Sequence, residues 1–393
     1  MKKLLSILLL LAMLTSTCLL FASCDKSGLE FSLNSDGQSY TCLGFKDGKE
    51  AAEAIIPETY KDLPVTAIAG KAFSAGISYN MVLSGETGED KVPLTSVTIP
   101  ESVVEIGNQA FYGCKSLTSI TLPSKLQSIG SEAFCRAGIS GSLVIPNTVN
   151  MLGMGAFSEC NSLTSVTLSS SLERVANSAF YNCTGLTSVT IPGEISIIDV
   201  SAFKNCTSLT KLVIPEGVTS IAYDSFEGCS SLKDLTLPDS LNDWSRSAFS
   251  GCDLEYEVYE GGNYIGNWLF YMNDRENITT FNIKEGTVGI MDNAFSGCEK
   301  MKGAIIIPDS VKIIASQAFY NCPGITSVYI PDSVEVMGRD AFAEWYPPYN
   351  SINRITLTIN CEAEEKPERW NGNWYYSSYG RDSYYTINWG ISN

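Results

Sequence analysis

Thirteen cysteines are the residues of this chain best suited to chemistry, because thiols can pair, bind metal ions or act as nucleophiles. Eight of them recur at one position of a repeating pattern: Cys114, Cys160, Cys183, Cys206, Cys229, Cys252, Cys298 and Cys322. Ala137 takes that position where the cysteine is missing. An in-line row does not make a tetrahedral metal cluster, so the spacing favours buried, reduced thiols that serve as small apolar side chains. Pairing of neighbours and a metal site remain alternatives, and the redox state of Cys42, Cys135 and Cys361, off the row, stays open.

Catalysis has few other candidates in this chain of 393 residues. The sequence contains no histidine and so lacks the usual general base near neutral pH and the commonest metal ligand. The acids Glu362, Glu364, Glu365 and Glu368 could in principle form a hydrolytic pair, but they lie close together on a solvated segment that implies no pocket. We therefore expect a non-enzymatic protein with no catalytic residue, no metal site and no cofactor.

The charge balance narrows the partners. With 43 acidic and 26 basic side chains, the net charge is -17, which repels phosphate backbones and provides no basic patch for nucleic acid or anionic lipid. Nucleic acid is therefore not an expected partner.

A short phrase ending in Phe recurs along most of the chain and indicates the fold. Its twelve copies end at Phe73, Phe111, Phe134, Phe157, Phe180, Phe203, Phe226, Phe249, Phe270, Phe295, Phe319 and Phe342. The spacing is 23 residues from Phe111 to Phe249, and the interval before Phe111 carries a 15-residue insertion, expected as a solvated loop near Ser74 to Lys91. A period in the low twenties predicts a leucine-rich-repeat solenoid: a right-handed, β-rich coil of about twelve repeats that bury one continuous core.

One complete copy shows which elements position the candidate residues. Residues 186–191 (LTSVTI) alternate as a strand with one buried face, and Pro192 ends that strand. Ile195 and Ile198 are expected on the opposite wall, and Ala202-Phe203 in the turn that follows. The row of cysteines then lies on the inner turn of successive coils, with neighbours about 4.8 Å apart.

Serine and threonine recur at the strand positions expected to face solvent. The candidate surface consists of Ser96, Thr98, Ser119, Thr121, Ser165, Thr167, Ser188 and Thr190, and the same positions in other copies hold Lys211, Val213, Asp234, Thr236, Ser327 and Tyr329. This face is rich in hydroxyls and nearly uncharged. It is either an extended docking surface for a protein or glycan or simply what an exposed strand tolerates.

Aromatic residues gather near the end of the chain, where Trp370 and Trp374 follow the acidic stretch described above. A solenoid needs its last apolar edge covered, so an aromatic cap is the first interpretation. The alternative is a carbohydrate-binding site in which these two rings stack on sugars. A second irregularity lies between Cys252 and Cys298, where aromatic residues replace the usual Leu and Thr, and it predicts either a packing kink or a lateral binding patch.

The repeat phrases resemble the BspA-type leucine-rich repeats of bacterial surface proteins. The resemblance rests on Leu-Thr-Ser-Val-Thr-Ile-Pro, Ala-Phe and Cys at fixed offsets and covers about residues 40 to 393. It implies no catalytic residue. It implies an extracellular interaction surface for adhesion to a protein or glycan, with host matrix among the partners.

The first residues form an export signal, with Lys2 and Lys3 before the apolar run from Leu4 to Leu14. Ala22-Ser23-Cys24 resembles the lipobox of bacterial lipoproteins, although Phe21 departs from it, and implies lipidation of Cys24. The protein is then exported, surface-exposed and held to the cell envelope only through its lipid anchor.

The expected organisation is a lipoprotein-type signal peptide at residues 1–23, a short tether at 24–39, the solenoid at 40–360 and a C-terminal cap at 361–393. Within the solenoid, residues 40–73 form the starter unit and 253–297 the irregular copy.

Overall fold

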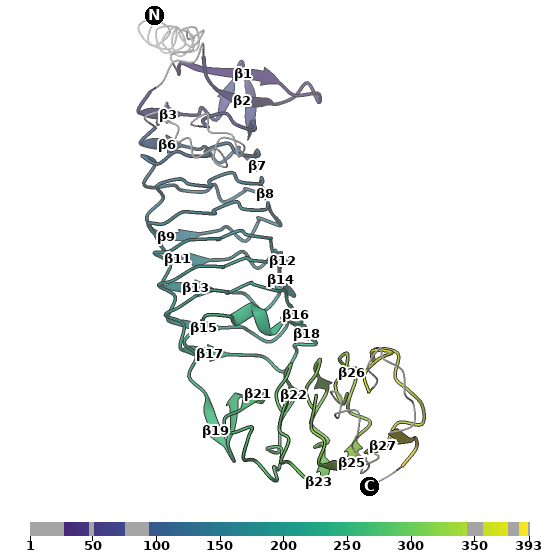
Figure 1. Cartoon of the computed structure of the whole chain (residues 1–393). Helices are drawn as coiled ribbons and strands as arrows, with labels where there is room; N and C mark the ends of the chain where they lie inside the picture. Colours follow the sequence, from purple (N-terminus) through teal and green to yellow (C-terminus); the bar gives the residue numbers. More distant parts are fainter. Residues whose placement is uncertain (1–26, 47–50, 75–93, 344–356, 376–384, 392–393) are drawn as a thin grey trace, which may run out of the picture.

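The computed structural model describes residues 27–46, 51–74, 94–343, 357–375 and 385–391. The chain winds into coils stacked on one another, as the 23-residue period predicts (Figure 1). The predicted signal peptide and Cys24, and almost all of the expected insertion loop, lie outside the described residues. In the part of the chain that the structure describes, no helix has the length and apolar character needed to cross a membrane.

Each coil contributes one strand to each of two walls. The front wall contains β3 (Glu53–Ile55), β6 (Ser96–Thr98), β9 (Gly141–Val144), β11 (Leu163–Thr167), β13 (Ser188–Thr190), β15 (Lys211–Val213), β17 (Asp234–Thr236), β23 (Gly303–Ile306), β25 (Ile325–Ile330), β27 (Leu357–Cys361) and β28 (Tyr385–Asn388). The back wall contains β2 (Tyr40–Phe45), β5 (Leu63–Ile68), β7 (Glu105–Ile106), β8 (Ser128–Ile129), β10 (Met151–Leu152), β12 (Arg174–Val175), β14 (Ile197–Ile198), β16 (Ser220–Ile221), β18 (Asp243–Trp244), β21 (Trp268–Met272), β22 (Gly289–Ile290), β24 (Ile313–Ile314) and β26 (Val336–Met337). Neighbouring strands within the ladders of each wall are parallel, except where the antiparallel strands described below begin a half.

The turn between the back wall and the next front strand holds the recurring Ala-Phe pair. The backbone N–H of each Phe donates to the carbonyl of the Ala one coil further on, as Phe111 does to Ala133 at 2.7 Å and Phe180 to Ala202 at 2.8 Å. On the back wall the donors point the other way along the axis, as Gly130 N–H does to Ile106. These two backbone ladders join every coil of the regular part to both of its neighbours.

The phenylalanine rings form a continuous stack inside the coil. From Phe73 to Phe249 successive ring centroids lie 5.1 to 5.6 Å apart, with the ring planes within 8° of parallel. A second stack joins Phe295, Phe319 and Phe342. Because the rings are buried, the repeat phrase ends in Phe wherever a coil must fit this stack.

The N-terminal end of the solenoid is closed by a hairpin, not by a tether. β1 (Leu29–Leu33) pairs antiparallel with β2, and β4 (Thr59–Tyr60) pairs antiparallel with β5. Leu29 is fully buried. The expected tether at 24–39 is therefore wrong from Leu29 onward, because the first coil has an apolar end that a strand must cover.

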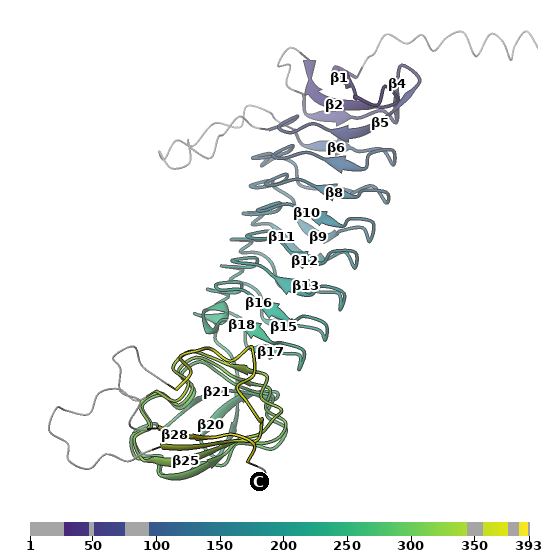
Figure 2. The same ribbon diagram turned by 90° about the vertical axis from the view of Figure 1, so that its right-hand side faces the viewer.

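The irregular copy changes the direction of the solenoid. It contains β19 (Glu257–Tyr259) and β20 (Gly262–Ile265), which pair antiparallel with each other, and β20 pairs antiparallel with β21. The coils before β19, called here the first half, stack downward in Figure 1, and those from β19 on, the second half, stack sideways. Viewed from the side in Figure 2, the coils of the second half superimpose, because the view runs along their axis. A short 3-10 helix, η2 (Arg246–Phe249), lies just before this elbow.

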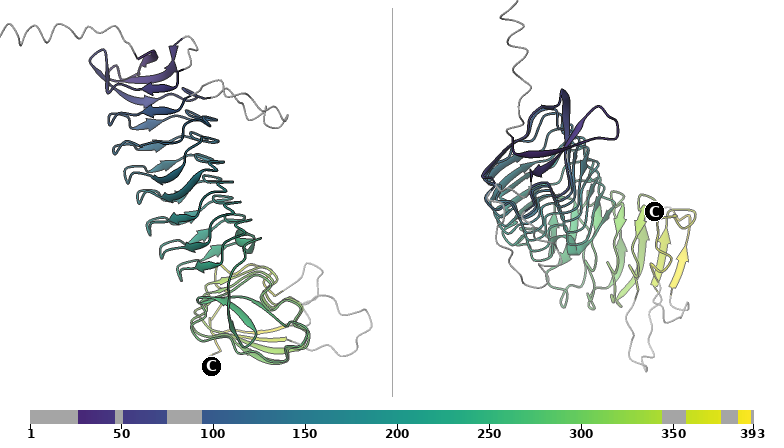
Figure 3. Two further views of the ribbon diagram at one scale, coloured as in Figure 1. Left: turned by 90° about the vertical axis from the view of Figure 1, so that its left-hand side faces the viewer. Right: turned by 90° about the horizontal axis from the view of Figure 1, so that it is seen from above.

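The elbow forms because the back wall of the second half packs on the end of the first half. Leu269, like the inward-facing residues beside it in β22, β24 and β26, belongs to the core of the second half. Trp268 and Ile313 face outward, yet they are buried in the core of the first half. Trp268 also donates its indole N–H to the carbonyl of Pro238 at 3.2 Å. The aromatic residues of the irregular copy thus form a packing kink between two short solenoids, and the view from above shows the second projecting from the first (Figure 3).

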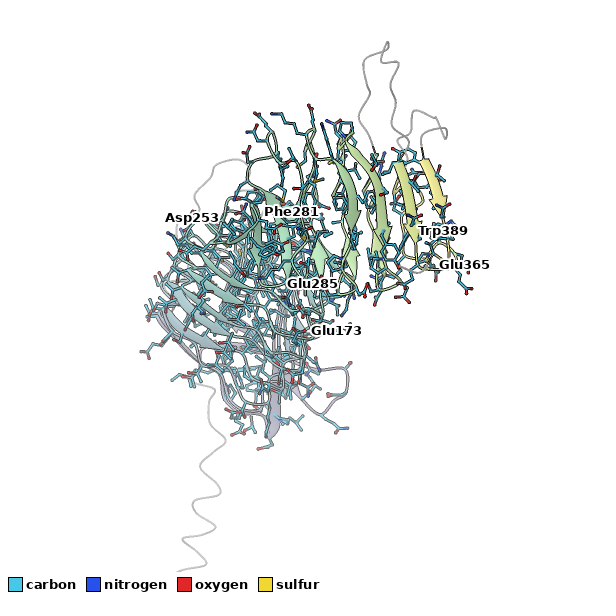
Figure 4. All side chains as sticks on the ribbon, turned by 90° about the horizontal axis from the view of Figure 1, so that it is seen from below. Glu173, Asp253, Phe281, Glu285, Glu365 and Trp389 are labelled. Carbon is cyan, nitrogen blue, oxygen red and sulfur yellow. The ribbon has the colours of Figure 1, made fainter. Side chains whose placement is uncertain are left out.

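The C-terminal segment covers the last coil, as the cap interpretation predicts. β28 extends the front wall beyond β27, and Trp370 forms a bridge with Met337 of the back wall. Figure 4 places Trp389 and Glu365 at this end of the second half and Asp253 at the opposite end.

Candidate binding surface

Two columns of side chains face outward from the front wall of the first half. The serine column is Ser96, Ser119, Ser142, Ser165 and Ser188, and the threonine column is Thr98, Thr121, Val144, Thr167 and Thr190. The strand register confirms both columns where ladders exist: Ser142, Ser165 and Ser188 are in line, as are Val144, Thr167 and Thr190. We call these ten residues the front face.

Ser119 and Thr121 do not lie on a strand, contrary to the sequence expectation. Both are exposed and occupy the predicted positions, but residues 117–122 form an extended segment without a ladder to β6 or β9. The carbonyl of Thr118 accepts the backbone N–H and the hydroxyl of Ser140, at 2.9 and 3.0 Å, in place of regular strand pairing. The face therefore continues through this coil although the hydrogen-bonded sheet does not.

The hydroxyls of the front face are available to a partner. Ser165 donates to Ser142 at 2.7 Å, which links two neighbouring coils across the serine column. Thr98, Thr121, Thr167 and Thr190 are exposed, and their hydroxyls make no hydrogen bond to another group within the described residues. Each threonine presents one free hydroxyl beside one methyl group, so the surface can form hydrogen bonds and apolar contacts together.

Ser142 and Val144 were not among the sequence candidates, because their coil reads Gly141-Ser142-Leu143-Val144 and lacks the usual threonines. Counting 23 residues on from Ser119 and Thr121 gives both positions. Val144 is 63% exposed, which is unusual for valine. The same counting places Glu53 and Ile55 before the front face and Lys211 and Val213 after it.

The front face carries no formal charge, whereas the chain as a whole carries -17. Acidic side chains lie at the edge where the front strands end. There Glu101 accepts hydrogen bonds from the N–H and hydroxyl of Ser124, and Glu216 accepts from the N–H of Asp239. A neutral strip of five coils is therefore flanked by carboxylates that stabilise the neighbouring turns.

The two tryptophans proposed for sugar stacking are inside the molecule. Trp370 is 2% exposed and Trp374 is 1% exposed. Trp370 donates its indole N–H to the carbonyl of Val334 at 2.9 Å, and Trp374 packs edge-on against Phe342. Neither ring offers a face to a ligand, and both extend the core over the last coil.

The cysteine row lies inside the solenoid. Its thiols are unpaired, and all but the half-buried Cys252 are buried. From Cys160 to Cys229 each thiol donates to the carbonyl of the Phe 26 residues earlier, at 3.1 to 3.3 Å. Burial raises the pKa of Cys160 and Cys183, so these thiols are poor nucleophiles.

Two of the three cysteines off the row behave in the same way. Cys42 and Cys361 are buried and unpaired, and burial raises the pKa of Cys42 to about 11 and that of Cys361 to about 12. Cys135 is also buried and unpaired, and its pKa is raised to about 12, first by burial and then by Glu159. Within the described residues, no group of three or more metal-ligating side chains is arranged around a common point.

Comparison with known proteins agrees with this geometry. The family model described as the BspA type leucine rich repeat region matches residues 89–210, 136–255, 196–301 and 263–363, in overlapping stretches. A solved leucine-rich repeat protein from Bacteroides ovatus ATCC 8483 is 18% identical, covers 92% of this chain and 98% of its own, and has a TM-score of 0.54. A leucine rich cell surface protein from Faecalibacterium prausnitzii A2-165 is 24% identical over 94% of this chain and 95% of its own, with a TM-score of 0.47. No curated protein matches the sequence.

The family match spans most of the stacked coils and includes the repeat phrase, the Ala-Phe turn and the cysteine row. With the matched residues covering well over half of the sequence, the chain belongs to the BspA-type leucine-rich-repeat family.

Proposed function

We propose that this protein is a non-enzymatic recognition protein of the bacterial cell surface and that its front face binds an extracellular macromolecule. One observation carries the proposal. A strip of exposed, uncharged side chains with free hydroxyls runs over five coils of a chain whose net charge is -17. Repeat solenoids bind through extended surfaces of this kind, and the rigid stacking of their coils keeps such a surface preorganised.

Membership of the BspA-type family supports a surface location and an interaction role. Leucine-rich-repeat solenoids are typically scaffolds for interaction. We propose export through the signal at residues 1–23 and anchoring through lipidated Cys24. The partner is an extracellular protein or glycan, with host matrix included, and no cofactor takes part.

The first experiment is binding of residues 25–393 to arrays of extracellular-matrix proteins and of bacterial, plant and host glycans, at two salt concentrations. The test variant is Thr167→Arg with Thr190→Arg, which places two long charged side chains in the middle of the front face. Its control is Met151→Arg, because Met151 is 62% exposed on the back wall. Loss of binding in the double variant alone supports the front face, and equal binding by both variants contradicts it.

Anchoring is tested separately in cells. Cys24→Ser should release the protein from the membrane fraction and remove acyl groups detected by mass spectrometry. Membrane retention of this variant would contradict a lipid anchor at Cys24.

A further inference from the structure

The outward columns of the first half have nearly the same composition when read from either end. With one residue added at each end, the threonine column is Ile55, Thr98, Thr121, Val144, Thr167, Thr190 and Val213. Counted outward from Val144, the pairs are Thr121 with Thr167, Thr98 with Thr190, and Ile55 with Val213. Threonine matches threonine and a β-branched apolar side chain matches another. All three apolar members are strongly exposed: 63% for Ile55, 63% for Val144 and 48% for Val213.

The serine column has the same symmetry but ends in opposite charges. It reads Glu53, Ser96, Ser119, Ser142, Ser165, Ser188 and Lys211. The five central members are identical, while the first is an acid and the last is a base. Glu53 is exposed, and Lys211 is exposed although its ammonium group contacts Asp234 at 2.6 Å.

A palindromic surface of this kind is what a two-fold symmetric contact requires, because each residue must suit its symmetry-related counterpart. The relevant axis runs along β9, in the plane of the contact. It brings two copies face to face with their solenoid axes antiparallel and keeps each column opposite its own equivalent. Val144 then meets Val144 of the second copy, Ile55 meets Val213, and Glu53 meets Lys211.

Charge favours the same arrangement. Two chains of net charge -17 repel each other over most approaches. The front face is neutral over five coils, and its two added ends carry a complementary pair. The two equal coil spacings also stay in step along the whole contact, since both surfaces repeat every 4.8 Å or about that distance.

We propose that the partner of the front face is a second copy of this chain, held in an antiparallel, two-fold symmetric dimer centred on Val144. This inference rests on the proposed function, because it assigns a partner to the same surface. Seven coils span a contact about 29 Å long, as six intervals of about 4.8 Å give. A contact of this size belongs to weak, reversible associations, so the dimer joins molecules that are already concentrated at a surface.

The test uses residues 25–393 in sedimentation velocity over the micromolar to millimolar range. We expect a reversible monomer–dimer equilibrium that Val144→Asp weakens by about tenfold or more, since the axis sets the two new carboxylates against each other. Glu53→Lys and Lys211→Glu should each weaken it, and the double variant should restore it. Met151→Asp on the back wall is the control and should leave the equilibrium unchanged.

Zero-length carbodiimide coupling of amines to carboxylates checks the register. It should yield a Lys211–Glu53 cross-link between copies, a pair that one copy cannot form because six coil intervals separate the two residues. A wild-type chain that stays monomeric throughout the range would overturn the dimer, as would charge reversals whose combination fails to restore it. The arrays separate the two proposals: if Thr167→Arg with Thr190→Arg abolishes array binding while the wild type remains monomeric, the front face still recognises another macromolecule and only the dimer fails.

Discussion

The thiol of Cys183 donates its hydrogen to the carbonyl of Phe157, 26 residues earlier, at 3.1 Å. The same contact recurs along the cysteine row, so one residue type fills the inner turn and also satisfies a carbonyl of the coil before it. The row is a packing device, and its chemistry follows from its burial.

Folded protein should resist thiol alkylation along the cysteine row. With iodoacetamide at neutral pH, we expect Cys160, Cys183 and Cys206 to react only after denaturation, because they are fully buried and their hydrogens are engaged. Half-buried Cys252 is the internal control and should react first. Peptide mass spectrometry resolves the sites, and rapid labelling of Cys183 in the native state would contradict the packing.

Alkaline pH should weaken the fold through Cys298. Burial raises the pKa of this thiol from 9.0 to about 11. Its folded pKa lies above its unfolded pKa, so its contribution is complete below pH 9 and is lost as pH rises towards 11, at about 1.4 kcal/mol per pH unit. Denaturant unfolding at several pH values measures the slope. The Cys298→Ala variant should lose less stability over that window than the wild type, because Ala137 already fits the row.

Removing one ring from the phenylalanine stack should be costly. Phe203→Ala is expected to lower the free energy of unfolding by about 3 to 5 kcal/mol, because the ring is fully buried and stacks on Phe180 and Phe226 at 5.3 Å. Tyr223→Ala serves as control, since Tyr223 is 59% exposed. Similar losses from the two variants, measured by denaturant unfolding, would show that the stack contributes little.

The elbow should be sensitive to one methyl group at Gly289. A Cβ built there would lie 2.1 Å from the indole of Trp268, which lies across the glycine. Gly289→Ala should therefore destabilise the protein by about 1 to 3 kcal/mol and alter the small-angle scattering profile by displacing the second half. Gly372→Ala has open space around its Cβ and is the matched control. An unchanged profile together with unchanged stability would contradict the packing described for the elbow.

The cap tryptophans should behave as core residues. Trp370→Ala is expected to reduce stability by about 3 to 5 kcal/mol, because the ring is buried and its N–H bonds Val334. Trp370→Phe should lose less, since it keeps most of the packed area. Glycans should not quench tryptophan fluorescence through this ring, and saturable quenching that disappears in Trp370→Phe would restore the sugar-binding interpretation.

The repeat period made most of the fold predictable. Strand, turn and cysteine positions follow from counting 23 residues, and the cap follows from the need to cover the last coil. The elbow did not follow, because the same back-wall position holds Ser128 in one coil and Trp268 in another, and only the fold shows that the second is buried by a distant coil. The strand Leu29–Leu33 was missed because its sequence carries no repeat phrase.

The front face was predictable in outline but not in symmetry. Its serines and threonines are visible in the sequence, whereas Ser142 and Val144 look like exceptions until the register aligns them with Ser165 and Thr167. The palindrome about Val144 depends on knowing which residues share a column.

The two backbone ladders of the coil have a consequence for how long such a molecule can be. In the Ala-Phe turn each N–H points to the following coil, and on the back wall each points to the preceding one. Their peptide dipoles oppose each other along the axis, whereas those of an α-helix add up. The ends therefore accumulate little partial charge as coils are added. A lineage can lengthen this molecule by whole repeats without building an electric field at its tips.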